Sequence, residues 1–331
     1  MTRRPPDSAR PAAVPMDHPH WDGLPTHHPQ VTPAHTHEQV AIHQPAKHAH
    51  FGVITLILAA LISACQPAPP PSATPTTNGD AYIIYMPVIG GNDQPTAQWW
   101  QPTPGLNWHI QLQGSLDTTL SVDVVFLDLF DTPTETIAAF TAYNVAVVCY
   151  FSAGTFEDWR PDADQFPPEV IGKALPEWEG EAWLDLRRAD LLVPIMRARF
   201  DLVQQKGCLG LDPDNLDGYL NDSGFDLTGQ DTAAYAIWLA NEAHSRGLAI
   251  GLKNNLPQVA ELEPYFDWAL NEQCLEYDEC DPYTAFITAN KPVFNIEYTG
   301  EPNIICPQAA ALGLDTLFAD YELNGPTTPC P

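Results

Sequence analysis

A series of eight short apolar segments, rich in β-branched and aromatic residues, limits the fold of this chain more than any other sequence feature. Several are apolar at nearly every position, as strands buried on both faces of a parallel sheet are. From Gly79 to the end there are about 250 residues, the usual length of a (β/α)8 barrel. The segments are Trp108–Gln113, Val122–Leu129, Val145–Phe151, Leu209–Asp212, Ala249–Lys253, Trp268–Asn271, Val293–Glu297 and Thr316–Ala319.

Segments with helical periodicity lie between several of these candidate strands. The clearest are Thr134–Tyr143, Ala189–Lys206 and Thr232–Arg246, and the last two end at a basic residue followed by glycine, as helices often do. Alternating strands and helices imply parallel strands joined by crossovers. We therefore predict that residues 81–331 form a slightly irregular α/β fold, a (β/α)8 TIM barrel with a short first crossover and no full eighth helix. The long, Trp- and Pro-rich segment Thr155–Arg188 is expected to decorate the barrel mouth.

The first 80 residues have a composition that does not suit a folded core. Residues 1–50 hold nine of the 11 histidines and nine prolines, so we interpret them as a disordered leader or as a stretch upstream of the true start codon. Residues 51–64 are an uncharged apolar run of 14 residues. This is too short to span a membrane comfortably but suits the hydrophobic region of a signal peptide. Residues 65–80, rich in Pro and Thr, suit an extended linker.

The apolar run ends in Leu61-Ile62-Ser63-Ala64-Cys65, which resembles the lipobox of bacterial lipoproteins. The resemblance implies that Cys65 is lipidated and that the protein meets the membrane through this N-terminal anchor only. A plain secretory cleavage site beside an incidental cysteine is the alternative. Both interpretations predict an exported protein that works outside the cytoplasm.

The chain is strongly acidic, with 42 Asp and Glu against 14 Lys and Arg and a net charge of −28. Phosphate backbones select for clusters of Lys and Arg, so this charge argues against nucleic acid as a partner. A negative surface attracts cationic partners, of which a cationic polysaccharide is one, although solubility alone also explains such a charge.

Six cysteines follow Cys65, and an even number in an exported protein indicates disulfides. Cys274 and Cys280 are six residues apart, which favours a local loop closed by a Cys274–Cys280 disulfide. The pairs Cys306–Cys330 and Cys149–Cys208 then follow by elimination. The sequence argues against a zinc site, because it has no C-x-x-C motif and only two histidines follow residue 50.

Six carboxylates stand at the ends of candidate strands. In a barrel the C-terminal ends of the strands meet at one face, which is where active sites form. Each acid alone could be a solvated strand cap, but six together exceed what a sheet requires, and few cations lie nearby to pair with them. Glycoside hydrolysis needs two such groups, one protonated to donate to the leaving oxygen and one ionised as nucleophile or base. The six are Asp128, Asp212, Asp214, Glu272, Glu297 and Asp320.

Aromatic residues near the same strand ends could stack on sugar rings, although each alone could equally serve packing. The run from Asp212 to Gly218 superficially resembles a calcium loop, which leaves a calcium-stabilised structural domain as a hypothesis. The run follows a strand rather than a helix and lacks the later Glu, so we predict neither a metal nor a cofactor. The aromatic residues are Tyr150, Phe151, Trp159, Trp178, Trp183, Tyr219, Tyr277 and Tyr298.

Several motifs between Trp99 and Tyr321 resemble, in order, those of glycoside hydrolase family 114. The resemblance implies a TIM-barrel endo-α-1,4-polygalactosaminidase, which cuts partly deacetylated, cationic α-1,4-galactosamine polymers of biofilms. The motifs are Val148-Cys-Tyr-Phe-Ser-Ala-Gly154, then Glu157 and Arg160-Pro-Asp-Ala163, Gly180-Glu-Ala-Trp-Leu-Asp185, Asp212-Pro-Asp-Asn-Leu-Asp-Gly-Tyr219, Gly251-Leu-Lys-Asn254 and Asn271-Glu-Gln-Cys274.

The same resemblance implies a catalytic pair made of an Asp in the fourth-strand motif and the Glu of the sixth. We assign Asp214 as nucleophile and Glu272 as acid/base, with Asp212 as a competitor for the first role; retention or inversion of the anomeric centre stays open. We expect a monomer, and a non-catalytic glycan-binding lipoprotein of the same fold is the alternative. The proposed substrate-binding residues are Asp128, Tyr150, Asn215, Lys253, Asn254, Glu297 and Tyr298.

Overall fold

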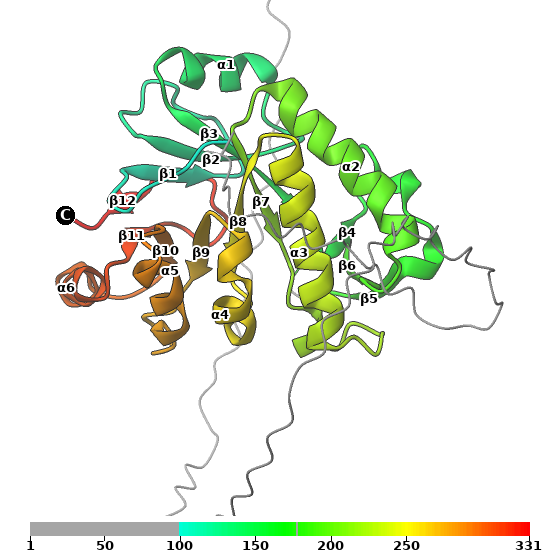
Figure 1. Cartoon of the computed structure of the whole chain (residues 1–331). Helices are drawn as coiled ribbons and strands as arrows, with labels where there is room; N and C mark the ends of the chain where they lie inside the picture. The colour runs from blue at the N-terminus through cyan, green and yellow to red at the C-terminus, as the bar shows by residue number, and fades with distance from the viewer. Residues whose placement is uncertain (1–98, 177) are drawn as a thin grey trace, which may run out of the picture. The chain divides into compact units, whose positions relative to one another are not determined.

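The computed structural model describes residues 99–176 and 178–331, all within a unit that spans Thr77–Pro331 (Figure 1). The predicted leader, signal peptide, lipidated Cys65 and linker lie outside the described residues, as do residues 81–98 of the predicted barrel domain. Among the described helices, none is long and apolar enough to cross a membrane.

Eight parallel strands form the barrel, in the order β1-β2-β3-β7-β8-β9-β10-β11, and a short antiparallel strand, β12, pairs with β11. The prediction of a (β/α)8 barrel is confirmed, and each predicted strand overlaps an observed one. The bounds are β1 Trp108–Gln111, β2 Val124–Asp128, β3 Ala146–Ser152, β7 Gly210–Asp214, β8 Ala249–Lys253, β9 Trp268–Glu272, β10 Val293–Glu297, β11 Asp315–Phe318 and β12 Thr328–Pro329.

The barrel is nearly rather than fully closed. Within the described part of the chain, no backbone ladder joins β1 to β11. The indole nitrogen of Trp108 donates instead to the carbonyl oxygen of Asp315 at 2.9 Å. The Leu112 N–H, just after β1, donates to the Leu323 carbonyl at 2.8 Å. The C-terminal segment after β11 therefore covers the seam, in place of an eighth helix.

The helices lie outside the barrel strands, and α2 and α3 run side by side along it (Figure 1). The predicted helix Ala189–Lys206 matches α2, which is capped by Gly207 with a φ of +87°. Helix α3 begins three residues before its predicted start because Thr228 and Asp231 form a capping box. The bounds are α1 Thr134–Ala142, α2 Ala189–Lys206, α3 Gly229–Ser245, α4 Val259–Leu262, α5 Thr284–Thr288 and α6 Pro302–Leu312.

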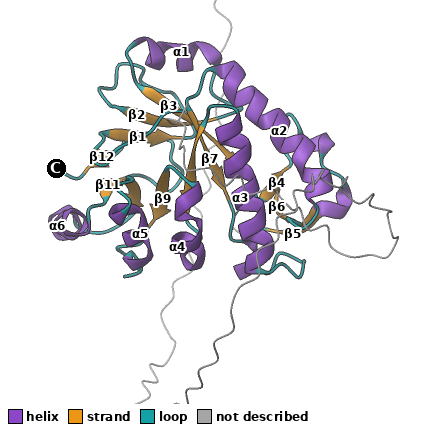
Figure 2. Cartoon of the chain, in the orientation of Figure 1, coloured by secondary structure: helices purple, strands orange, loops and turns teal. Residues whose placement is uncertain are grey.

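The segment Thr155–Arg188 forms a small antiparallel sheet that stands apart from the barrel strands (Figure 2). Its strands are β4 Thr155–Glu157, β5 Ile171–Ala174 and β6 Glu181–Leu184, in the order β4-β6-β5. In the register of β4 and β6, Glu157 lies opposite Glu181. This insertion between β3 and α2 brings side chains to the barrel mouth that the barrel strands do not carry.

Alternate residues of each barrel strand point inward, because side chains alternate between the two faces of a strand. One apolar cluster gathers inward residues such as Phe126, Trp268 and Phe294. The second gathers the intervening residues, such as Leu127, together with helix residues such as Phe200. Both faces are thus apolar over most of the strands.

The Trp268 ring crosses the barrel interior against two glycines. A Cβ at Gly251 would lie 2.1 Å from the Trp268 indole nitrogen, and a Cβ at Gly210 would lie 2.9 Å from the ring carbon Cη2. Neither distance leaves room for a side chain, so β7 and β8 need glycine here. The wide ring fills the barrel beneath the mouth and gives the acids above it a packed floor.

Three disulfides link Cys149 to Cys208, Cys274 to Cys280 and Cys306 to Cys330. The predicted Cys274–Cys280 pair is confirmed, together with the two pairs reached by elimination. The Cys274–Cys280 disulfide closes the loop after β9, the strand that ends at Glu272.

Candidate active site

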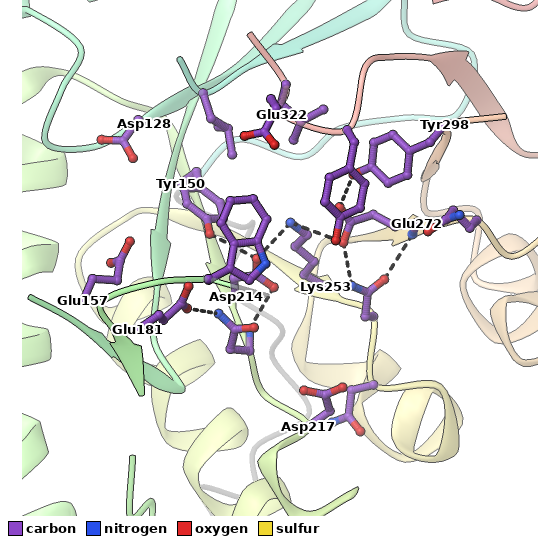
Figure 3. A pocket seen from close by; sticks show the side chains of 18 of the residues that line it. Asp128, Tyr150, Glu157, Glu181, Asp214, Asp217, Lys253, Glu272, Tyr298 and Glu322 are labelled. Carbon is purple, nitrogen blue, oxygen red and sulfur yellow. Dashed lines mark hydrogen bonds and ion pairs between the residues drawn. The ribbon is translucent and has the colours of Figure 1, made fainter. Parts of the chain in front are cut away.

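A cavity of about 960 Å³ opens at the C-terminal ends of the barrel strands (Figure 3). Its lining comes from β2, β3, β7, β8 and β9, from the small sheet, and from the loops that follow β9, β10 and β11. Among the described residues, nine Asp or Glu line it against two basic residues, Arg160 and Lys253. The cavity is therefore strongly acidic.

Asp214 and Glu272 face this cavity from β7 and β9, with Lys253 of β8 between them (Figure 3). Lys253 Nζ lies 2.9 Å from Asp214 Oδ2 and 3.5 Å from Glu272 Oε2. The sequence predicted strands that end at Asp212 and Asn271, but β7 continues to Asp214 and β9 to Glu272. The two acids are thus fixed by regular strands rather than by loops.

Three donors hold the Asp214 carboxylate. Besides Lys253, the Tyr150 hydroxyl donates to Oδ2 at 3.1 Å and the Asn215 backbone N–H donates to Oδ1 at 2.8 Å. These three contacts fix the position of the Asp214 carboxylate at the end of β7.

Glu272 is held by another set of donors. The Tyr298 hydroxyl donates to Oε1, and Asn254 Nδ2 donates to Oε2 at 2.8 Å. Burial acts to raise the pKa of Glu272, but the Lys253 charge and these hydrogen bonds outweigh it, so the pKa lies below its ordinary value. Glu272 is accordingly ionised in the free protein and must gain a proton to act as an acid.

Lys253 is buried, with a side chain 3% exposed. Burial alone would lower the pKa of Lys253, but the charges of Asp214 and Glu272 hold it well above its ordinary value. Its Nζ also lies 5.1 Å from the centre of the Tyr150 ring. Lys253 therefore stays charged and forms ion pairs with both acids. Its predicted contact with substrate stays a prediction.

Asp212, the competitor for the nucleophile, lies two residues before Asp214 on the same face of β7. It is 0% exposed, it does not line the cavity, and neither carboxyl oxygen has a hydrogen-bond partner among the described residues. Burial, helped by the charges of Asp214 and Glu272, raises the pKa of Asp212 from 3.8 to about 7 despite the nearby Lys253. This placement favours Asp214 for attack on a bound substrate.

The raised pKa of Asp212 predicts a pH-dependent loss of stability. The folded protein keeps the Asp212 proton between pH 4 and about 7 while the unfolded chain loses it, so stability falls as the pH rises through this range. Asp212→Asn, neutral at every pH, should gain up to about 4 kcal/mol relative to wild type between pH 4 and 8. Urea unfolding of both proteins at the two pH values measures the difference, and a constant difference would contradict the expectation.

Two acids predicted to bind substrate, Asp128 and Glu297, bond to other groups of the protein instead. Asp128 lines the cavity, but both its oxygens bond to Arg160, at 3.0 and 2.8 Å. The prediction that Glu297 lies at the mouth is wrong. Glu297 points away from the cavity, is fully buried, and accepts hydrogen bonds from Leu275 N and Asn295 Nδ2. Its carboxylate fixes the loop after β9, because Leu275 belongs to that loop.

Tyr150, Asn215, Asn254 and Tyr298 all line the cavity as predicted, and each bonds to an acid there. Asn215 and Asn254 follow Asp214 and Lys253 directly and have φ values of 63° and 50°. Asn adopts this left-handed region more readily than most residues, and here the turn directs its amide back into the site. Whether these four side chains touch substrate stays a prediction.

Other residues of the cavity were not identified as site residues from the sequence. Glu181 belongs to the motif Gly180–Asp185, but the sequence alone indicated no role for it. Its pKa is raised to about 7, mainly by burial. Asp217 lies one turn after Asp214, and burial raises its pKa to about 6. Among the predicted aromatics, Phe151 and Trp183 are buried in packing instead. The remaining cavity residues include Glu157, Tyr283, Tyr321, Leu220 and Glu322.

The acids of the cavity are spread around its wall. Within residues 99–176 and 178–331, no three His, Cys, Asp or Glu side chains are grouped as ligands of one metal ion. The run that resembles a calcium loop is divided, because Asp212 is enclosed in the barrel while Asp214 and Asp217 reach the cavity.

Residues 91–331 match glycoside-hydrolase family GH114. The structure is similar to that of Aspergillus fumigatus Ega3 in complex with galactosamine, with 39% identity, a TM-score of 0.66, and coverage of 70% of this chain and 97% of that one. The glycoside hydrolase domain of PelA from Pseudomonas aeruginosa shares the fold, with 14% identity, a TM-score of 0.57, and coverage of 68% and 98%. No curated protein sequence matches the chain.

Proposed function

Because the chain belongs to glycoside-hydrolase family GH114, and so is a glycoside hydrolase, we propose that it cuts α-1,4-linked, galactosamine-rich polysaccharide at internal bonds. The observation that carries the proposal is the pair Asp214 and Glu272, joined by Lys253 in one cavity at the barrel mouth. Two carboxylates on either side of a scissile bond are what glycoside hydrolysis requires.

The charge of the cavity supports a cationic substrate. Nine acids face two basic residues there, and Asp128 already pairs with one of the two. Ega3, the similar protein, was crystallised with galactosamine, a sugar whose amine is charged at neutral pH. Exposed side chains along the cavity rim offer apolar faces for several sugar rings, which suits internal cutting. They are Trp159, Leu220, Tyr277 and Tyr321, which are 48 to 61% exposed.

In the proposed reaction, Glu272 first takes up a proton from solvent. Asp214 then attacks the anomeric carbon while Glu272 gives this proton to the leaving oxygen of the cleaved bond. The C–O bond to the leaving sugar breaks as the bond to the Asp214 oxygen forms. In the second step Glu272 takes a proton from water, the water oxygen attacks the same carbon, and Asp214 is released. Tyr150 and Asn215 hold the nucleophile, and Tyr298 and Asn254 hold the acid/base.

The distance between the two acids supports retention of the anomeric configuration. Since Lys253 Nζ lies 2.9 Å from Asp214 Oδ2 and 3.5 Å from Glu272 Oε2, these oxygens are no farther apart than the sum of the two distances. The ~5–5.5 Å between the carboxyl groups of retaining enzymes is compatible with that limit, and we propose retention on this ground.

Hydrolysis of a defined α-1,4-galactosamine oligomer tests the proposal. Mass spectrometry is expected to show products from internal cuts, and NMR during the first minutes should show the α-anomer as the new reducing end. Initial β-anomer would contradict retention. Binding of the oligomer without any product would instead favour the non-catalytic glycan-binding lipoprotein.

We further propose that the protein works outside the cytoplasm, anchored through Cys65. Three disulfides suit an oxidising compartment, and the lipobox-like sequence before Cys65 suggests the anchor. Cys65→Ser should move the protein from the membrane fraction to the soluble exported fraction of a bacterial host, as followed by immunoblotting. Equal membrane association of both forms would contradict the lipid anchor.

A further inference from the structure

Two glutamates of the small sheet face each other in the cavity wall. Glu157 of β4 and Glu181 of β6 are register partners in the antiparallel pair, so their side chains share one face. Both line the cavity and both are buried, with exposures of 3% and 7%. Figure 3 shows them together on one side of the cavity, next to Asp214.

This arrangement leaves negative charge without a matching positive charge. Like charges directly opposite on paired strands are destabilising. The nearest cation, Arg160, bonds to Glu157 Oε1 at 2.7 Å and also to both oxygens of Asp128. Two buried carboxylates, those of Asp128 and Glu157, therefore share one guanidinium with the exposed Asp131. Glu181 forms no ion pair with any described residue. Lys253, the other basic residue of the cavity wall, is already held by Asp214 and Glu272.

Each glutamate also has an unused oxygen. Glu157 Oε2 is buried and has no hydrogen-bond partner among the described residues. Glu181 uses Oε1 to accept from Thr155 Oγ1 and from Asn215 Nδ2, the latter at 3.1 Å, and no described residue donates to its Oε2. A buried carboxylate oxygen without a donor is costly, as at Glu157 Oε2. A ligand that brings N–H groups and positive charge would satisfy this oxygen and Glu181 Oε2 together.

The pair lies beside the reacting groups. Asn215 joins them directly, because its Nδ2 bonds to Glu181 and its backbone N–H bonds to Asp214 Oδ1 at 2.8 Å. The charges of Glu157 and Asp214 lie close enough to raise the pKa of Glu181, although burial raises it most. A sugar ring attacked by Asp214 would thus place a neighbouring substituent near these glutamates.

We propose that Glu157 and Glu181 bind the free ammonium group of an amino sugar next to Asp214 and so select deacetylated over N-acetylated residues. An ammonium offers three N–H donors and a positive charge to the two oxygens that lack a donor. An acetamido group offers one neutral donor and adds a bulky acetyl, so the charges would stay unmatched. The inference rests on the proposed hydrolysis of galactosamine polymers and names the side chains that set its specificity.

Glu181→Gln is the sharpest test, because glutamine keeps the Oε1 acceptor used by Thr155 and Asn215 while it removes the charge. We expect kcat/KM for a fully deacetylated α-1,4-galactosamine oligomer to fall about 10- to 100-fold, mainly through KM. For the N-acetylated oligomer of the same length the change should stay within about threefold. Glu135→Gln, on the exposed surface of α1 and outside the cavity wall, is the matched control.

Calorimetry with galactosamine itself gives a second measurement that does not depend on turnover. Because the pKa of Glu181 is about 7, wild type at pH 6 should release a proton on binding the ammonium, whereas Glu181→Gln should release less. Comparing two buffers of different ionisation enthalpy measures this release.

The outcomes separate the inference from the proposed function. Unchanged cleavage of the deacetylated oligomer by Glu181→Gln, or equal binding of galactosamine and N-acetylgalactosamine by wild type, overturns the inference alone. Absence of cleavage by wild type overturns the hydrolytic proposal, and Glu181-dependent binding of galactosamine would then still support the ammonium site. Binding that is lost on addition of EDTA and restored by Ca²⁺ would replace the ammonium site by a cation site.

Discussion

Asp214→Asn is expected to lower kcat on an α-1,4-galactosamine oligomer by about 10³-fold or more. The variant keeps the shape of the side chain and the donors from Tyr150, Asn215 and Lys253 nearby, but it removes the charge that attacks the anomeric carbon. Steady-state kinetics measure the loss, and thermal unfolding checks that the variant is folded.

Azide then distinguishes the roles of the two acids. With the smaller Asp214→Ala, azide can attack the opposite face of the sugar and should restore turnover with a β-glycosyl azide product. With Glu272→Ala, azide should instead yield the α-glycosyl azide, and substrates with a good leaving group should lose much less rate. The reverse pattern would exchange the two assignments.

Asp212→Asn serves as the comparison for the Asp214 variant, because the two aspartates lie two residues apart on one strand. Asp212 is enclosed beneath the cavity and unable to reach a bound ring, so its loss should cost less than about tenfold in kcat. An Asp212 variant as inactive as the Asp214 variant would contradict this division of roles.

The barrel could be predicted from the sequence because its strands are apolar on both faces and are separated by helical segments with glycine ends. The eight predicted strands overlap the eight observed parallel ones, and the limits of β8 and β10 agree to the residue. Strand β7 extends two residues beyond its predicted end at Asp212. Its last residues are Asp212-Pro-Asp, which lack the β-branched and aromatic residues that indicate a strand.

The inward and outward faces could not be told apart from the same pattern. When both faces are apolar, alternation of polar and apolar residues disappears, and nothing in the sequence says which face a strand-end acid takes. Glu272 and Glu297 both end a strand, yet Glu272 points into the barrel mouth and Glu297 points under the loop that carries Leu275. Register across the sheet decides this, and register is a property of the assembled barrel.

The small sheet could not be predicted from the sequence for a different reason. Its strands have only three or four residues, and the segment between β3 and α2 is rich in Pro and charged residues, so it reads as a loop. Glu157 and Glu181 are 24 residues apart in sequence, and only the antiparallel pairing of β4 with β6 brings them together. Their shared role could not be inferred without that pairing.

Lys253→Met is expected to damage both stability and catalysis, because Lys253 is buried between the two acids of the site. Removing one partner of a buried ion pair leaves the other charges uncompensated, which typically costs about 3–5 kcal/mol of unfolding free energy. Loss of this fixed charge should also lower kcat/KM by about 10²–10³-fold, since Asp214 and Glu272 would repel each other and lose their alignment. Urea unfolding and steady-state kinetics measure the two effects.

The pH dependence of Lys253→Met separates an electrostatic role from a purely structural one. The Lys253 charge is the main influence that lowers the pKa of Glu272, so in its absence that pKa should rise. Since Glu272 must be protonated for the first step, kcat/KM falls as the pH rises through its pKa, and this fall should move to higher pH in the variant. Lys173→Met removes an exposed lysine whose ion-pair partner among the described residues is Asp222, and it should change neither stability by more than about 1 kcal/mol nor the pH profile. A Lys253 variant with the wild-type pH profile and a lower rate would mean that the lysine only supports the fold.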